Sequence, residues 1–190
     1  ETARATLEID LASIDAGSTE ADEESAGKLW FDRAAFPKAR FESTQVRALG
    51  TAQIAGLASD DLNGLSSAQF QALTTQQVAA LTTLQVSTLA TEDLVGFSTA
   101  SIRALSTAAI AALDSVQFPA LTTTQVAAMT TAQVAAIETA DFAVIETADL
   151  AALATASIRA LTDAQLAALG SDQWAAMGTN QVRALSTAQI

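Results

Sequence analysis

The phrase STQVRALG, residues 43–50, recurs every eight residues without insertion or deletion as far as TNQVRALS, residues 179–186. A truncated TAQI follows at residues 187–190, so the tract holds 18 full octads and part of another. Repeats this short indicate an array in which each unit packs against its neighbours. The repeat therefore predicts the architecture and leaves the biochemical activity open.

Each octad carries two apolar residues three positions apart. Counted from Ser43, the fourth and seventh positions are apolar, as in Val46 and Leu49. This spacing puts both side chains on one face of a short helix. The first position is Ser or Thr except at Asp163, and all three residue types are good helix N-caps. We therefore predict one helix per octad, with the first residue as N-cap and Gln or Asp in the first turn.

An eight-residue period excludes a single long helix, because the apolar stripe would rotate by about 80° at every octad. A β-solenoid is the rival architecture, since Thr-Val pairs suit strands. However, the apolar residues lie three rather than two apart, and they are surrounded by alanine, a poor strand former. The sequence predicts a mainly α fold, a solenoid of short N-capped helices.

Helices this short are not stable alone, so stacking must stabilise them. Positions four and seven are too few to offset the entropy of ordering the array. We therefore expect the alanines at positions five and six to be buried as well, with two or three octads per layer. Trp174 and the phenylalanines at position four should be core residues. Pro119, which has no N–H at a helical position, predicts a locally distorted coil.

Residues 1–42 differ from the octads and are predicted to form an N-terminal cap segment containing β-strands. LEIDLASIDAG, residues 7–17, alternates apolar and polar residues and ends in glycine, as a strand and turn do. An acidic linker follows at residues 18–27, and then an aromatic-rich stretch. We expect a β-hairpin-like cap on one end of the solenoid and an uncapped apolar edge at Ile190.

Parts of this segment resemble a fragment of the YceI-like family of small periplasmic or secreted, lipocalin-like β-barrels that hold isoprenoid-type lipids. The resemblance covers residues 1–50 and is carried by residues 9–17, 22–23, 30–32, 36–37 and 41. It implies a lipid-binding carrier as an alternative function. The remaining strands of such a barrel are missing, so we expect no closed lipid cavity. The octads more weakly resemble Thr/Ala-rich octapeptide tracts of long bacterial surface proteins.

Composition narrows the chemistry. The chain has no histidine and no cysteine, which removes imidazole bases, thiolate nucleophiles and their metal sites. A net charge of −12 argues against nucleic acid, because phosphate contacts need clustered Lys and Arg. No segment is long and apolar enough to insert into a membrane. We therefore expect no enzyme activity, cofactor, metal site or catalytic residue.

Two residue patterns are candidate sites. Paired carboxylates could hold calcium or act as acid and base, but first-turn carboxylates also suit helix N-termini, which we favour. Arginines that recur every 56 residues could align on one face, but a solvated position five explains them more simply. The carboxylates are Asp60, Asp61, Glu92, Asp93, Glu138, Asp141, Glu146 and Asp149, and the arginines are Arg47, Arg103 and Arg159.

The sequence thus favours a non-enzymatic structural or interaction array, a spacer, stalk or scaffold of a bacterial surface or secreted protein. Its expected location is extracellular or in the cell envelope. Its expected partners are another protein or a second copy, joined end to end through the uncapped C-terminal end. The lipid carrier is one alternative, and an artificial chain with no evolved function is another.

Overall fold

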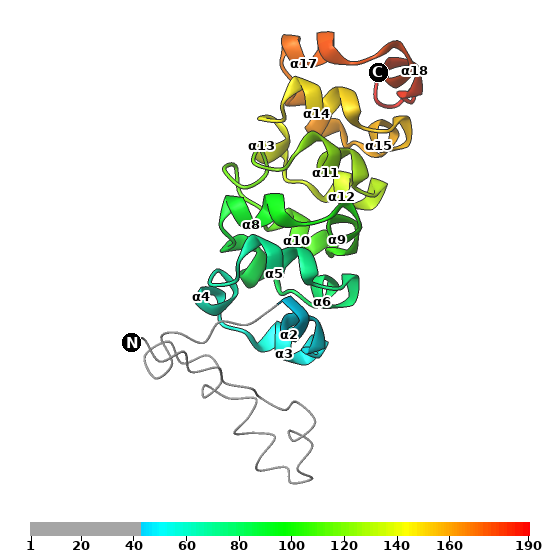
Figure 1. Ribbon diagram of the computed structural model, residues 1–190. Coiled ribbons are helices and arrows are strands. Elements are labelled where there is room, and N and C mark those ends of the chain that lie inside the picture. The colour runs from blue at the N-terminus through cyan, green and yellow to red at the C-terminus, as the bar shows by residue number, and fades with distance from the viewer. Residues whose placement is uncertain (1–42) are drawn as a thin grey trace, which may run out of the picture.

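The computed structural model describes residues 43–190 as a stack of short α-helices, and no strand occurs within this range (Figure 1). The predicted mainly α solenoid is confirmed there, and the β-solenoid alternative is wrong. The helices are α2 Ser43–Ala48, α3 Thr51–Gly56, α4 Ser59–Leu62, α5 Ser67–Ala72, α6 Thr75–Ala79, α7 Thr83–Ser87, α8 Thr91–Gly96, α9 Thr99–Ala104, α10 Thr107–Ala111, α11 Thr123–Ala128, α12 Thr131–Ala136, α13 Thr139–Phe142, α14 Thr147–Ala152, α15 Thr155–Ala160, α16 Asp163–Ala167, α17 Ser171–Ala176 and α18 Thr179–Ala184. The expected β-hairpin-like cap, residues 1–42, lies outside the described residues.

The helix begins one residue earlier than the sequence predicted. The N-cap is the eighth residue of the preceding octad, and the first position is the first helical residue. Thr74, for example, is the N-cap of α6, and its hydroxyl accepts a hydrogen bond from the backbone N–H of Gln77 at 3.3 Å. The expectation that the first position is the cap is therefore wrong. Ser and Thr are frequent at both positions, so the composition of the phrase did not distinguish them.

Glutamine at position three completes a capping box. The Oε1 atom of Gln77 accepts a hydrogen bond from the backbone N–H of Thr74 at 2.8 Å, so each residue satisfies an amide of the other. Where glycine is the N-cap, the glutamine half of the box remains. The Gly50 N–H donates to Oε1 of Gln53 at 2.8 Å. Where glutamine holds position three, a helix of only five or six residues thus begins with its N-cap amide satisfied.

Most helices end because position seven adopts an extended backbone. Leu57 has φ −61° and ψ 137°, and the N-cap Gly50 is likewise extended at φ −71° and ψ 161°. The Leu57 N–H donates to the carbonyl of Ile54 at 3.2 Å, which closes the last turn. Two extended residues, at positions seven and eight, therefore redirect the chain between successive helices.

Three octads make one coil of the stack. Each helix packs against the helix three octads away, as α2 does against α5 and α15 against α18. The structure thus holds three columns of helices, at the upper end of the expected two or three octads per layer. The first coil consists of α2–α4, the second of α5–α7, the third of α8–α10, the fourth of residues 115–138, the fifth of α13–α15 and the sixth of α16–α18.

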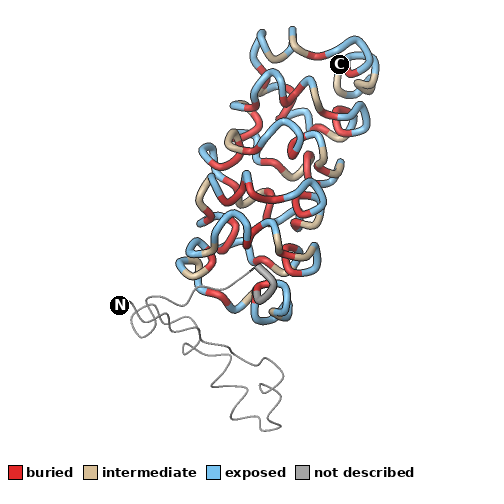
Figure 2. The backbone as a smooth tube through the Cα atoms, viewed as in Figure 1, coloured by how far each residue is buried: buried red, intermediate tan, exposed pale blue. Residues whose placement is uncertain are grey.

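The core runs along the axis of the stack, where buried segments of successive coils meet (Figure 2). Position-four side chains from Val46 to Leu166 expose 0–4 % of their surface. Most position-seven side chains are also buried, and the rings of Phe70 and Phe97 pack edge to face at 5.6 Å between centroids. The predicted apolar pair is therefore confirmed as the core.

Besides positions four and seven, one further octad position is buried, and it is not the one that the sequence predicted. Position-five residues are exposed or half-buried throughout, so the expected burial of alanine there is wrong. Position six is mostly half-buried, and Gly96, which packs on α5, is its buried exception. Instead, position three is buried in every octad from Gln69 to Gln165. Positions three, four and seven share one face of the helix, so a polar residue lies beside the two apolar ones.

These glutamines bridge one coil to the next. The Nε2 group of Gln133 donates to the carbonyls of Ile102 at 2.7 Å and Leu105 at 2.8 Å, which lie 31 and 28 residues earlier. The neighbouring Oε1 atom accepts from a backbone N–H, so the partners define the orientation of the amide. Nine glutamines donate in this way to carbonyls of the octad four repeats earlier, namely Gln77, Gln85, Gln117, Gln125, Gln133, Gln165, Gln173, Gln181 and Gln189.

The octad that contains Pro119 is the exception to the helical pattern. Residues 115–120 form turns rather than an α-helix, as the missing N–H of Pro119 predicts. The N-cap function persists, because the carboxylate of Asp114 accepts from the N–H groups of Val116 and Gln117 at 2.9 and 2.7 Å. Gln117 still bridges to the carbonyls of the second coil. The predicted distortion is confirmed and stays within one octad.

The cap register can be tested with neighbouring threonines. Thr130 is the N-cap of α12 and accepts from the Gln133 N–H at 3.2 Å, whereas Thr131 is the exposed first helical residue. We expect Thr130→Ala to lower the free energy of unfolding by about 1 kcal/mol, since an N-cap hydrogen bond is lost. Thr131→Ala should change it by less than about 0.5 kcal/mol. Urea unfolding followed by circular dichroism measures both, and a larger loss at Thr131 would restore the originally predicted register.

Candidate functional site

The paired carboxylates divide into exposed and buried members. Glu138 and Glu146 are exposed N-caps of α13 and α14, while Asp141 and Asp149 are buried at position three of the same helices. Asp60 and Glu92 are exposed at position two, beside Asp61 and Asp93 at position three. Among residues 43–190, no three acidic side chains lie close enough together to hold a metal ion.

The buried aspartates occupy the position that glutamine holds elsewhere. Asp93 is only 4 % exposed, and the register places it toward the carbonyls 28 and 31 residues earlier. Burial, with a smaller contribution from the neighbouring Glu92, raises the pKa of Asp93 from 3.8 to about 6. Burial also raises the pKa of Asp141, with smaller contributions from Glu138 and Asp114.

Asp149 shows most directly that a carboxylate fits poorly at this buried position. It is 3 % exposed, and among the described residues its Oδ1 atom is buried without a hydrogen-bond partner. A glutamine at this position would present an amide N–H group to the preceding coil, whereas a carboxylate presents only acceptors. A buried aspartate at position three therefore lacks the donor with which glutamine joins the octads.

The burial of position three was not predicted from the sequence, although the octad carries a signal for it. From Gln53 onward, glutamine at position three always follows Ser, Thr, Gly or Asp three residues earlier. Where Asp takes its place, the preceding N-cap is Ala or Glu, as in Ala90 and Asp93 or Glu138 and Asp141. The two positions change together because the glutamine carbonyl needs the N-cap amide and favours a hydroxyl beside it.

The arginines do not form a cluster. Arg47, Arg103 and Arg159 are exposed at position five of α2, α9 and α15, and these three helices do not pack against one another. The third column does bring Arg159 and Arg183 onto the neighbouring helices α15 and α18. The solvated position-five interpretation fits their exposure.

The largest change from the core pattern lies in the C-terminal coil, α16–α18. Trp174 and Val182 occupy position four, yet they are 37 % and 45 % exposed. The prediction that Trp174 is a core residue is therefore wrong. Ile190, also at position four, is 89 % exposed. The side chains of three position-four residues are thus exposed to solvent in this part of the stack.

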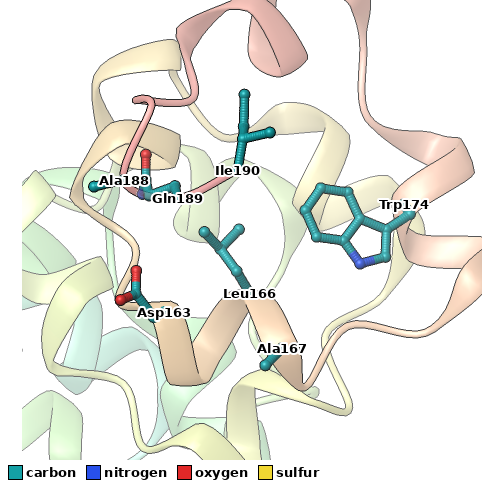
Figure 3. Close-up of a pocket in the computed structure, with 7 residues that line it drawn as sticks. All are labelled: Asp163, Leu166, Ala167, Trp174, Ala188, Gln189 and Ile190. Atoms are coloured by element: carbon teal, nitrogen blue, oxygen red, sulfur yellow. The ribbon is translucent and has the colours of Figure 1, made fainter.

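A hollow of about 440 Å³ lies among these residues. Figure 3 shows the side chains of Leu166, Trp174 and Ile190 around it, with Asp163 at its edge. Its lining is mixed apolar and polar, and no nucleophile paired with a base is found in it. The hollow offers a surface for packing rather than a site for chemistry.

No helix of the described range is both long and apolar enough to cross a membrane.

Comparison with known families identifies the octads. A family model described as the ALTTAQ repeat matches residues 39–75, 54–91, 86–123 and 142–179, which together span more than half of the chain. No curated protein and no solved structure matches the chain. The matches support the predicted repeat tract. They give no support to the resemblance of residues 1–50 to the YceI-like family.

The buried aspartate at position three of α8 should make stability depend on pH. The pKa of Asp93 is higher in the folded than in the unfolded chain, so the ionised carboxylate destabilises the fold at neutral pH. Stability should therefore rise as the pH falls from about 8 through 6 toward 4. We expect Asp93→Asn to raise the free energy of unfolding at pH 8 by on the order of 1 kcal/mol, with the gain shrinking at pH 5.

Asp172→Asn is the matched control, because Asp172 is exposed at position two of α17. It should show no gain at pH 8, since removing an acidic residue from a first helical turn costs a few tenths of a kcal/mol. Thermal melts of the three proteins at pH 5 and pH 8 give the comparison. An Asp93→Asn variant that is less stable than the natural chain at pH 8 would contradict the account of this position.

Proposed function

Because the chain belongs to the ALTTAQ repeat family, we propose that residues 43–190 act as a non-enzymatic structural array, a spacer or scaffold. The single observation that carries the proposal is the repetition of one coil interface along the stack. Every helix packs on the helix three octads away, and successive coils add length in one direction (Figure 1). Such an array holds its two ends, and any domains or partners attached to them, at a fixed distance.

The side chains support a passive role. The exposed positions carry mainly Ser, Thr and Ala, and the nine bridging glutamines donate to carbonyls of earlier octads. The chain contains no histidine and no cysteine, so imidazole-based proton transfer and thiol chemistry have no residues to use. We propose an extracellular or cell-envelope setting, on the ground that the octads resemble tracts of long bacterial surface proteins.

A spacer must hold a fixed length, and this property can be measured. The chain has no natural cysteine, so spin labels can be placed at will. Ala68, Ala140 and Ala164 are exposed at position two of octads in one column, and they lie whole coils apart. With roughly 8–10 Å between packed helices, Ala68→Cys with Ala140→Cys spans three coils, about 24–30 Å. Ala68→Cys with Ala164→Cys spans four coils, about 32–40 Å.

Double electron–electron resonance should give narrow distance distributions for both labelled pairs. The longer pair should exceed the shorter by one coil. Broad distributions, or equal mean distances for the two pairs, would contradict a spacer of fixed length.

A further inference from the structure

We propose that the outer surface of one helix column, from α8 in the third coil to α13 in the fifth, docks an extended polypeptide segment that is both basic and apolar. This goes beyond a passive spacer, because it gives the array a partner along its side. We call this surface the docking strip. Its residues are Val95, Val116, Pro119 and Val144, with the carboxylates Glu92, Asp114 and Glu138.

The docking strip continues from one coil to the next. The octads of α8, of residues 115–120 and of α13 lie three octads apart, so they stack in one column. Figure 1 shows α8 and α13 on the same side of the stack. The carboxylates of Glu138 and Asp114 both raise the pKa of Asp141 on α13, so these side chains lie near one another across two successive octads of the column.

Large exposed apolar side chains gather in this column. Between residues 43 and 162 there are four of them, and three lie here on consecutive coils, namely Val95, Val116 and Val144 at 47 %, 67 % and 47 % exposed. They hold positions five, two and six, which share the outer face of a helix. Position five is polar or alanine in the other octads, and its two larger apolar residues, Val95 and Pro119, follow each other in this column. Apolar surface rimmed by polar residues is typical of a protein interaction site.

The charge on the docking strip has one sign. Glu92, Asp114 and Glu138 are exposed, and each lies at the start of one of the three stacked octads. The same three octads contain no lysine and no arginine. Because unlike charges attract and like charges repel across an interface, the strip favours a basic segment and rejects an acidic one.

The spacing of the coils selects an extended partner. Stacked helices lie roughly 8–10 Å apart, so apolar and acidic side chains recur at about this distance along the strip. A polyproline II segment advances about 9 Å in three residues and returns its side chains to one face at every third residue. A segment of about nine residues, with one apolar and one basic residue in each group of three, therefore matches three coils.

Fluorescence anisotropy with labelled peptides and the full chain tests the proposal. The probe is a Pro-Lys-Val repeat of about 15 residues, and a Pro-Glu-Val repeat of equal length has the same shape and the opposite charge. The Pro-Lys-Val peptide should bind saturably with a dissociation constant between about 1 µM and 1 mM, and the Pro-Glu-Val peptide should not bind. Absence of saturable binding by the first peptide, or equal binding of both, would overturn the proposal.

Val116→Lys locates the binding, and Leu84→Lys is its matched control. Both side chains are 67 % exposed at position two, but Leu84 lies on α7 in another column. Both variants add the same charge to the chain, so attraction to its net charge changes equally. Val116→Lys should weaken binding about tenfold or more, whereas Leu84→Lys should change it by less than about twofold. Equal losses in the two variants would overturn the proposal, because the contact would then depend on net charge alone.

Glu92→Gln and Asp60→Asn form a second pair, which leaves the apolar part of the strip intact. Both carboxylates are exposed at position two, Glu92 on α8 and Asp60 on α4 in another column. Glu92→Gln should weaken binding roughly two- to fivefold, and Asp60→Asn should leave it unchanged. Circular dichroism should show all four variants folded. A loss at Asp60→Asn as large as that at Glu92→Gln would contradict docking on this column.

Discussion

The fold depends on the buried primary amide of glutamine at position three, which joins three backbone segments at once. Its oxygen accepts the N-cap N–H of its own helix, and its nitrogen donates to two carbonyls in the preceding coil, as Gln133 does. Only a side chain with a donor and an acceptor on one planar group can make both contacts. A helix of about six residues is not stable alone, so this group starts the helix and fixes its place on the stack.

The cross-coil amides are not evenly distributed along the array. The second, fourth and sixth coils carry glutamine at position three of every octad, as at Gln117, Gln125 and Gln133 in the fourth. The third and fifth coils carry none, and hold Asp93, Ser101 and Ala109 in the third and Asp141, Asp149 and Ser157 in the fifth. Bridged and unbridged coil interfaces therefore alternate. Local opening should be easier where the glutamines are absent and where carboxylates with raised pKa values are buried.

Much of this architecture could be predicted from the sequence, because the apolar spacing within one octad is a local property. Val46 and Leu49 define a helix face whatever lies beyond it, and Pro119 disrupts its octad for a backbone reason. The cap position and the burial of glutamine were missed for a different reason. The cap position was missed because an uninterrupted repeat has the same period whichever residue is counted first. The burial of glutamine was missed because its contacts reach carbonyls 28 and 31 residues earlier, and these lie close only once the chain has wound into coils. Trp174 was missed because its exposure depends on its place at the end of the stack.

Cross-coil donation by glutamine, and not only its capping contact, holds the coils together. Gln133→Glu keeps an oxygen for the Thr130 N–H but replaces the donor to Ile102 and Leu105 with a second acceptor. Gln53→Glu makes the same change where the side chain is exposed and caps Gly50. Urea unfolding at pH 7 should show Gln133→Glu less stable than Gln53→Glu by about 1–3 kcal/mol, since buried donors are lost and acceptors face acceptors. Equal stabilities of the two variants would contradict the account.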